Sequence, residues 1–275
     1  MISNYEAELS FAKQTAYEAG KIMLHYFNAE QKGLTFKEDQ SPVTLADTQI
    51  NILVIESVVS VYPDHGVLGE EQGHELNRNK LWIVDPLDGT GPFSRGVPIS
   101  VFSMAYAEDG VVKAAVVYDP FTDRLYSAAE GQGAYENDRK LDLHAHQPAE
   151  TLSVLLEVSG KAWSTFEDPD IGGAMLNAFA RAEDTSTYYL PIASSLALVA
   201  AGRFDAIVTS GKNPWDLAAG AFIAQEAGAI VTDIFGNPIY LWDREVSGVC
   251  AAKPDVHARM IEIINPVMKT SSLYL

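Results

Sequence analysis

Residues 82–90 constrain the fold most, because they read Trp-Ile-Val-Asp-Pro-Leu-Asp-Gly-Thr: a short apolar strand that ends in two aspartates on a tight turn. Carboxylates at the end of a buried strand are costly to remove from water, and the next cation along the chain is Arg95. We therefore expect a bound group to neutralise Asp85 and Asp88, and a hard metal ion is the natural candidate. A surface turn in which the aspartates cap backbone amides is the simpler alternative.

Two other segments place acids where an element ends or begins. Glu70 and Glu71 follow the apolar residues 66–69, and Asp216 stands in the first turn of a helix that begins after Asn213-Pro214. Taken singly, the glutamates fit a solvated loop and Asp216 fits the third helical position behind an Asn cap. Asp47 likewise fits a capping box with Thr44.

Helix N-termini also attract phosphate, so a capping role does not exclude a role in a site. Two helices that open with an aspartate and two strands that end in acids predict one pocket for metal and phosphate.

The composition narrows the class of protein. The chain has 275 residues, enough for one large or two small domains, and 37 acidic against 19 basic residues give a formal charge of −18. This charge argues against binding to nucleic acid or an anionic membrane, and a small anionic substrate would need bound cations. The lone Cys250, the lack of roughly 18 consecutive apolar residues and the lack of a leader-like N-terminus lead us to expect a cytoplasmic protein.

Hydrophobic periodicity predicts that the two halves of the chain differ in secondary structure. Residues 4–27 and 44–62 have the spacing of amphipathic helices, and they accompany a largely antiparallel set of strands. These strands are expected at residues 67–68, 82–84, 100–106, 111–118 and 125–129.

After about residue 145, strands and helices alternate. Strands are expected at 154–158, 206–208, 230–231 and 249–251, and helices at 174–181, 194–201, 215–227 and 255–264. We therefore expect an α+β protein with an N-terminal domain at 1–147 and a smaller C-terminal α/β domain at 148–275 that completes the site.

Together the motifs resemble the inositol monophosphatase family of magnesium-dependent, lithium-sensitive phosphomonoesterases. The resemblance covers nearly the whole chain and rests on four segments. They are Lys37-x-Asp39-x-Ser41-Pro42-Val43-Thr44-x-Ala46-Asp47, Gly69-Glu70-Glu71, residues 82–90, and Trp215-Asp216-Leu217-Ala218-Ala219-Gly220 with Glu226-Ala227-Gly228. It implies a layered α-β-α-β-α sandwich and a homodimer.

The resemblance also implies a role for each site residue. Glu70, Asp85 and the Leu87 carbonyl would bind one Mg²⁺, and Asp85, Asp88 and Asp216 a second, with a looser third ion at Glu70. Thr90 and Asp47 would orient and deprotonate the attacking water. The residues expected around the substrate are Asp88, Gly89, Thr90, Asp216, Ile192 and Thr209.

General chemistry agrees with this assignment. Oxygen ligands without His or Cys favour Mg²⁺ or Mn²⁺ over zinc. Two ions about 4 Å apart can activate water on one side of phosphorus and stabilise the leaving oxygen on the other, with no covalent intermediate.

Three features depart from the family pattern, all on the substrate side. Gly91-Pro92 follow Thr90, the segment 190–195 replaces a glycine-containing turn, and Thr209 replaces an acid that grips inositol hydroxyls. Both neutral drift and altered specificity fit these changes, and without that acid we expect shallow selectivity for inositol phosphates.

Inositol-1-phosphate is therefore the default small phosphorylated substrate. Histidinol-phosphate, fructose-1,6-bisphosphate and 3′-phosphoadenosine or NADP phosphates are the alternatives, and a catalytically weak regulatory binding protein is the alternative class.

Overall fold

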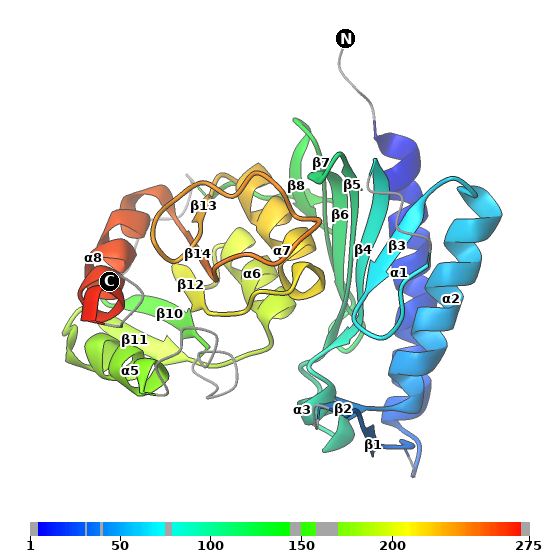
Figure 1. Cartoon of the computed structure of the whole chain (residues 1–275), viewed down its shortest axis with the longest axis horizontal. Helices are drawn as coiled ribbons and strands as arrows, with labels where there is room; N and C mark the ends of the chain where they lie inside the picture. The colour runs from blue at the N-terminus through cyan, green and yellow to red at the C-terminus, as the bar shows by residue number, and fades with distance from the viewer. Residues whose placement is uncertain are drawn as a thin grey trace.

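The helices and strands form five layers in the order helix, sheet, helix, sheet, helix (Figure 1). The computed structural model describes residues 5–30, 32–38, 41–74, 79–143, 150–157 and 170–270. From one outer layer to the other, the helices are α1 (Glu6–Phe27) and α2 (Leu45–Val61), then α6 (Ile192–Ala200) and α7 (Pro214–Glu226), then α5 (Ile171–Arg181) and α8 (Pro254–Thr270). The expected α-β-α-β-α sandwich is confirmed.

The first sheet has seven strands in sequence order, and only its first pair is parallel. The strands are β3 (Gly66–Gly69), β4 (Lys80–Asp88), β5 (Val101–Glu108), β6 (Val111–Asp119), β7 (Arg124–Ala129), β8 (Gly133–Glu136) and β9 (Arg139–Lys140). Turns at 108–110 and 119–123 join β5 to β6 and β6 to β7, so the expected antiparallel arrangement is confirmed.

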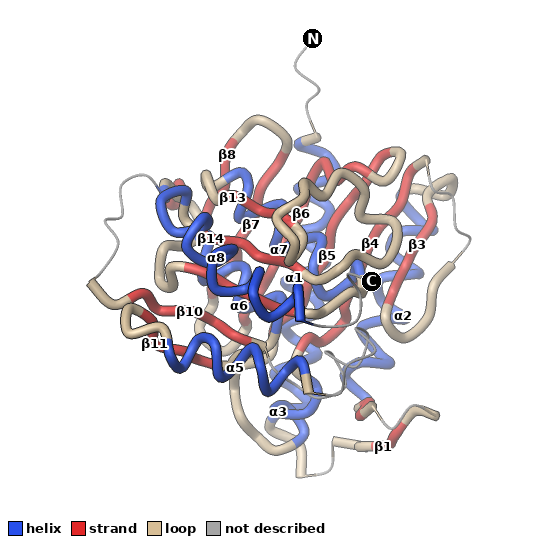
Figure 2. The backbone as a smooth tube through the Cα atoms, turned by 60° about the vertical axis from the view of Figure 1, so that its left-hand side comes forward, coloured by secondary structure: helices blue, strands red, loops and turns tan. Residues whose placement is uncertain are grey.

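The second sheet has five strands in the order β11-β10-β12-β14-β13. They are β10 (Leu152–Leu156), β11 (Thr185–Tyr188), β12 (Ala206–Thr209), β13 (Ile230–Thr232) and β14 (Val249–Ala252). β10 runs parallel to both β11 and β12, and β14 runs antiparallel to β12 and β13. Figure 2 brings the outer side of this sheet forward, where α5 and α8 lie over the strands.

Strand β4 is buried on both faces, which explains its continuous apolar run. Leu81 and Ile83 pack with the cluster that contains α6 and α7, and Trp82 and Val84 pack with the cluster that contains α1 and α2. Successive side chains of a strand point to opposite faces, so a strand with helices on both sides needs an apolar residue at every position. The aspartates that follow are therefore carried into the interior with the strand.

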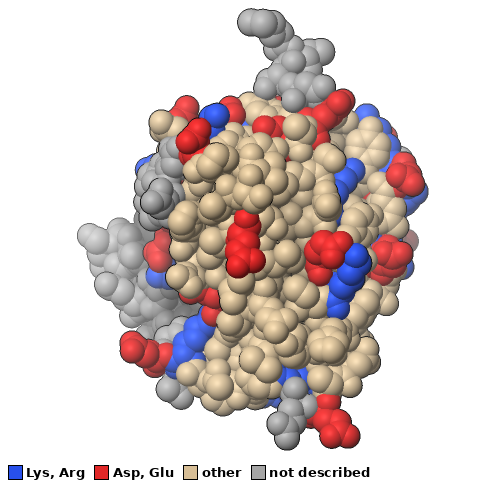
Figure 3. All heavy atoms as spheres, turned by 90° about the vertical axis from the view of Figure 1, so that its right-hand side faces the viewer, with Lys and Arg blue, Asp and Glu red and all other residues tan. Residues whose placement is uncertain are grey.

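The outer face of α1 and α2 meets the solvent. Figure 3 shows this side of the molecule, where acidic and basic side chains lie scattered among uncharged ones and form no large basic patch. Among the described helices, none combines the length and apolar character that a bilayer-spanning segment needs.

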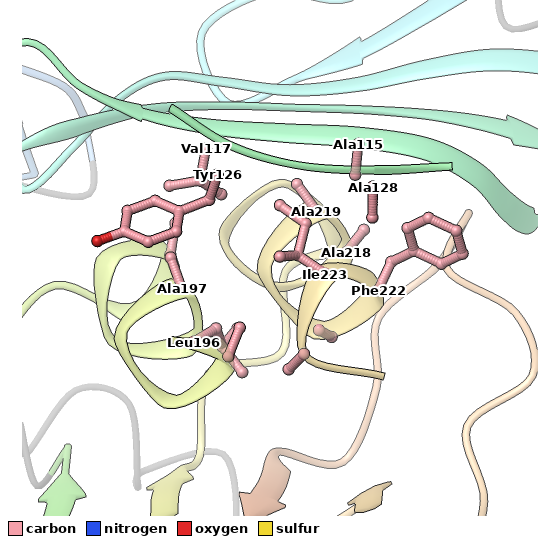
Figure 4. Packing of buried hydrophobic residues seen from close by; sticks show 14 of the residues in the cluster. Ala115, Val117, Tyr126, Ala128, Leu196, Ala197, Ala218, Ala219, Phe222 and Ile223 are labelled. Atoms are coloured by element: carbon pink, nitrogen blue, oxygen red, sulfur yellow. The ribbon is translucent and has the colours of Figure 1, made fainter. Parts of the chain in front are cut away.

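The central helices α6 and α7 pack closely because their contact residues are small. Ala197, Ala218 and Ala219 lie toward the first sheet, whereas Leu196 lies farther from this sheet and packs against Gly220 of α7 (Figure 4). α7 is buried around most of its circumference, as expected for a helix between two sheets. Both sheets thus contribute to one continuous core.

Short elements account for most differences from the sequence-based expectation. The expected helices and strands are present, but β4 extends to Asp88 instead of ending at Val84, and α5 begins at Ile171. The elements that periodicity missed are β1 (Thr35–Phe36), β2 (Pro42–Val43), α3 (Thr90–Ser94), β8, β9 and β11. Residues 144–149, where we expect the domain boundary, and Val158 lie outside the described residues.

The close approach of α6 and α7 yields a test of the core. A Cβ added at Gly220 would lie 2.5 Å from Leu196 Cβ, whereas one added at Gly173, in α5, would meet nothing within 4 Å. We expect Gly220→Ala to lower the free energy of unfolding by about 1–3 kcal/mol through overpacking, although alanine favours helices.

Gly173→Ala is the matched control and should leave stability unchanged or raise it by up to about 1 kcal/mol. Denaturant unfolding of both variants checks this, and equal stability changes would contradict the proposed contact.

Candidate active site

Parallel pairing of β3 with β4 brings the first two acidic segments together. Gly69 stands opposite Val84, and the Glu70 amide donates to the Val84 carbonyl at 3.3 Å. Because parallel strands end at the same edge of a sheet, Glu70 lies beside Asp85.

A local irregularity holds Asp85, Leu87 and Asp88 at that edge. The register with β5 shifts between Asp85 and Asp88, and the Leu87 amide donates to Asp85 Oδ1 at 2.8 Å. All three residues are buried. The expected turn is thus part of the strand end, and its carboxylates lie inside the protein and not on its surface.

Gly89 lets the chain leave this turn and approach the second half of the protein. Its φ of 91° lies in the left-handed region, and an added Cβ would lie 2.8 Å from Pro191 Cγ. Thr90 then begins α3.

Asp47 serves a helix cap and the site at once. Asp47 Oδ2 accepts from the Thr44 amide at 2.8 Å and from the Thr44 hydroxyl at 2.5 Å, which is the expected capping box. Asp47 Oδ1 accepts from the Thr90 hydroxyl at 3.0 Å. The capping and catalytic readings of Asp47 are therefore compatible.

Asp216 completes an acidic triplet. Asn213 caps α7, Pro214 is its first residue, and Asn213 Nδ2 donates to Asp216 Oδ2 at 3.3 Å. One carboxylate oxygen each from Glu70, Asp85 and Asp216 lie within 4.8 Å of one another. Three acids from distant segments therefore share a space of the size that a metal ion occupies.

Asp88 lies beside the triplet and turns one oxygen to α6. Asp88 Oδ2 accepts from the Ala193 amide at 2.8 Å and from the Ser194 amide at 3.4 Å. The free amides of a helix N-terminus stabilise a carboxylate there. Asp88 Oδ1 takes no part in these two hydrogen bonds.

Crowding of buried acids changes their proton affinity. Burial, together with the charges of Glu70 and of the neighbouring aspartates, raises the pKa of Asp85 and of Asp216 well above the ordinary value. Burial raises the pKa of Asp88 to about 7, against the hydrogen bonds from α6. Burial also raises the pKa of Asp47. These shifts arise from burial and from repulsion between neighbouring carboxylates, and an all-oxygen set of this kind suits Mg²⁺ or Mn²⁺.

A cation that the sequence reading did not assign reaches the edge of the cluster. Lys37 Nζ lies 2.9 Å from Glu70 Oε1 and 2.6 Å from Glu71 Oε1. Hydrogen bonds to the two glutamates outweigh burial and raise the pKa of Lys37. Lys37 belongs to the motif quoted above, but spacing alone did not indicate this contact. Asp39 of the same motif lies outside the described residues.

The substrate side differs from the expectation at Thr209. Thr209 is fully buried, and its hydroxyl donates to Glu157 Oε2 at 3.0 Å and accepts from the Gly211 amide at 2.9 Å. Thr209 stands where the family has an acid, but a carboxylate that the sequence did not indicate lies beside it, from Glu157 directly after β10. No motif marked Glu157, which stands 52 positions before Thr209.

Local structure accounts for the positions of Ile192 and Pro92. Ile192 begins α6 at half-buried depth and packs close to Gly211. Pro92 lies in the first turn of α3, where a backbone amide has no intrahelical acceptor. The missing amide of Pro92 therefore costs the helix nothing.

Comparison with known proteins agrees with this geometry. The model of the inositol monophosphatase family matches residues 4–269. Inositol monophosphatase 1 of Bos taurus is 29% identical over 260 residues, covering 90% of this chain and 91% of its own. Nus factor SuhB of Vibrio cholerae is 34% identical over 237 residues, covering 85% and 87%.

Solved structures support the same relationship. The structure of an inositol monophosphatase of Thermotoga maritima has a TM-score of 0.81 at 26% identity and covers 96% of this chain and 98% of its own. The structure of the extragenic suppressor protein SuhB of Bartonella henselae has a TM-score of 0.82 at 26% identity and covers 94% and 98%. This protein therefore belongs to the inositol monophosphatase family and is a phosphoric monoester hydrolase.

Proposed function

We propose that the protein is a Mg²⁺-dependent phosphatase of small phosphorylated metabolites, with inositol-1-phosphate as the default substrate. The convergence of Glu70, Asp85 and Asp216 carries this proposal, because three acids in one space bind a phosphate dianion only when cations lie between them. Glu70, Asp85, the Leu87 carbonyl, Asp88 and Asp216 would hold two or three ions.

Bound Mg²⁺ would supply Lewis acidity, which polarises the phosphate and lowers the pKa of a water molecule. The protein's own part is to accept the water's proton. The hydroxyl of Thr90 donates to Asp47 Oδ1, so its oxygen can accept from water while its own proton moves toward the carboxylate. Asp47 is held for this role by its two hydrogen bonds from Thr44.

Further contacts hold both members of the Thr90–Asp47 pair in place. The Thr90 hydroxyl also lies 3.1 Å from the Leu87 carbonyl oxygen, and Asp47 is nearly completely buried. A fixed pair avoids the reorganisation that a mobile base would undergo in the reaction. Gly89 and Thr90 are the residues we assign to the phosphate, and Asp216 would contact the substrate through a bound ion.

Several substrate classes remain candidates. The relatives include a protein of Thermotoga maritima named fructose-1,6-bisphosphatase/inositol-1-monophosphatase, 30% identical over 259 residues. Sugar bisphosphates therefore stay beside inositol phosphates, as do histidinol-phosphate and 3′-phosphoadenosine or NADP phosphates. Lithium sensitivity and a homodimer stay predictions from the resemblance, and a cytoplasmic location stays a prediction from the composition.

A regulatory binding role is the second candidate. It is favoured by relatives named Nus factor SuhB, such as that of Escherichia coli at 31% identity over 258 residues, because this name states no enzymatic activity. Against a purely regulatory role, the chain keeps Asp47, Glu70, Asp85, Asp88, Thr90 and Asp216.

Removal of metal tests the proposal directly. We expect EDTA to abolish phosphate release from inositol-1-phosphate and added Mg²⁺ or Mn²⁺ to restore it, because the acids repel the substrate when no cation is bound. A colorimetric phosphate assay over a metabolite panel, with and without Mg²⁺, measures both the requirement and the preferred substrate. Full turnover in metal-free buffer would contradict the assignment of the acids as metal ligands.

Thr90→Ala tests the proton relay. We expect kcat to fall by about 10²-fold or more, while the Mg²⁺ concentration for half-maximal activity changes little. Ser94→Ala is the control, because it removes a hydroxyl of the same helix that donates to the Gly91 carbonyl and not to Asp47. Equal losses of kcat and of Mg²⁺ affinity would instead make Thr90 a metal ligand.

The pKa shifts predict how the stability of the metal-free protein depends on pH. An aspartate pKa raised from 3.8 to about 7 at Asp88, with raised values at Asp85 and Asp216, means that the folded state holds protons which the unfolded state has released. Their contribution to the unfolding free energy is therefore lost as pH rises through the folded pKa values.

The Tm of metal-free protein should thus fall between about pH 5 and about pH 8, and Mg²⁺ should raise Tm more at the higher pH, because it binds the ionised acids. Asp216→Asn should flatten this dependence. Differential scanning calorimetry with EDTA or Mg²⁺ checks both points, and an equal Mg²⁺ effect at both pH values would count against the shifted acids as ligands.

A further inference from the structure

Glu157 lies directly after β10, at the edge of the second sheet that faces the site. β10 and β12 are parallel with Leu156 opposite Val208, and the Glu157 amide donates to the Val208 carbonyl at 3.0 Å. This pairing continues one residue beyond the strand and sets the Glu157 side chain beside Thr209. Only 6% of Glu157 is exposed.

Thr209 fixes the orientation of this carboxylate. Its hydroxyl donates to Glu157 Oε2 at 3.0 Å and accepts from the Gly211 amide at 2.9 Å. With donor and acceptor both engaged, the hydroxyl has one preferred direction. Gly211 in turn packs close to Ile192 at the start of α6, where the adjacent amides hold Asp88.

Glu157 also acts on the metal side of the site through its charge. It is among the charges that raise the pKa of Asp216, and together with Asp88 it raises the pKa of Tyr189, after burial in both cases. Glu157 is therefore within electrostatic reach of a proposed metal ligand and of Tyr189, whose side chain is 59% exposed. A glutamine would accept the hydrogen bond from Thr209 without the cost of another buried negative charge near Asp216.

We propose that Glu157 determines substrate specificity by binding hydroxyl groups on the alcohol part of the substrate. The inference rests on the proposed phosphatase function. A carboxylate has two oxygens that accept several hydrogen bonds, which suits neighbouring hydroxyl groups. Thr209 is then a positioning residue, and the acid absent from β12 is replaced by one from the neighbouring strand β10.

A pair of substrates with the same ring isolates the hydroxyl groups. Inositol-1-phosphate and cyclohexyl phosphate share a six-membered carbon ring, but only the first carries further hydroxyls. We expect Glu157→Gln to lower the ratio of kcat/KM for inositol-1-phosphate to that for cyclohexyl phosphate by about 10-fold to 100-fold, as for loss of a charged hydrogen bond.

Two further variants complete the experiment. Thr209→Val keeps the carboxylate but removes its orienting donor, so it should raise KM for inositol-1-phosphate with a smaller effect on kcat and a smaller fall in the ratio. Glu183 is an exposed acid just before the first residue of β11, at the edge of the second sheet that lies away from Glu157. Glu183→Gln is therefore the control, and the ratio of kcat/KM values should equal that of the wild-type protein. Circular dichroism and thermal unfolding report whether each variant folds.

The outcomes separate the two claims. An unchanged ratio in folded Glu157→Gln, or equal losses on both substrates, would overturn the role of Glu157 and leave the phosphatase function standing. If Glu157→Gln does not fold, the Thr209→Val ratio decides, and an unchanged value overturns the proposal. If the wild-type protein with Mg²⁺ hydrolyses neither substrate but releases phosphate from another compound of the metabolite panel, this inference fails and the phosphatase function stands. Release from no compound of the panel would overturn both.

Discussion

The parallel pairing of β3 with β4 is the constraint on which the site depends. It is the one parallel pair of the first sheet, and it makes two strands end at the same edge, so that Glu70 stands beside Asp85. β4 is covered by helices on both faces, so its end lies in the interior and its acids lose most of their hydration. The same packing that stabilises the sheet thus creates a concentration of negative charge, which bound cations or protons relieve.

Helix ends supply the rest of the electrostatic environment. Asp47 lies in the first turn of α2, Asp216 in the first turn of α7, and Asp88 accepts from amides at the start of α6. The partial positive charge of a helix N-terminus stabilises each carboxylate by a modest amount, about 0.3–1 kcal/mol at exposed positions and up to about 2 kcal/mol when partly buried. These amounts hold the acids in place but do not match the cost of burying several charges together, which is consistent with the raised pKa values of Asp85 and Asp216.

The metal side of this arrangement was readable from the sequence because each of its signals is local. The apolar residues 82–84 predict a buried strand, and the spacing from Thr44 to Asp47 predicts a capping box. Asn213 followed by Pro214 predicts the start of α7. The sequence did not predict strands β8, β9 and β11, because they are short and partly exposed and their residues show little apolar periodicity. The contacts of Lys37 and Glu157 were not predicted for another reason. Lys37 contacts Glu70, 33 positions away, and Glu157 contacts Thr209, 52 positions away, and only the folded chain brings these residues together.

The two sides of the site therefore have different structural origins. The residues assigned to metal and water come from the edge of the first sheet and from the starts of α2 and α7, and they are tied together by hydrogen bonds and by the shared space of the triplet. The residues assigned to the alcohol come from the ends of β10 and β12 in the second sheet. The two sides meet where Gly89 packs against Pro191 and where Asp88 accepts from the Ala193 amide at the start of α6. If Glu157 binds the alcohol as proposed, substrate preference depends on Glu157 and Thr209 in the second sheet, whereas hydrolysis depends on acids held by the first sheet and by the starts of α2 and α7.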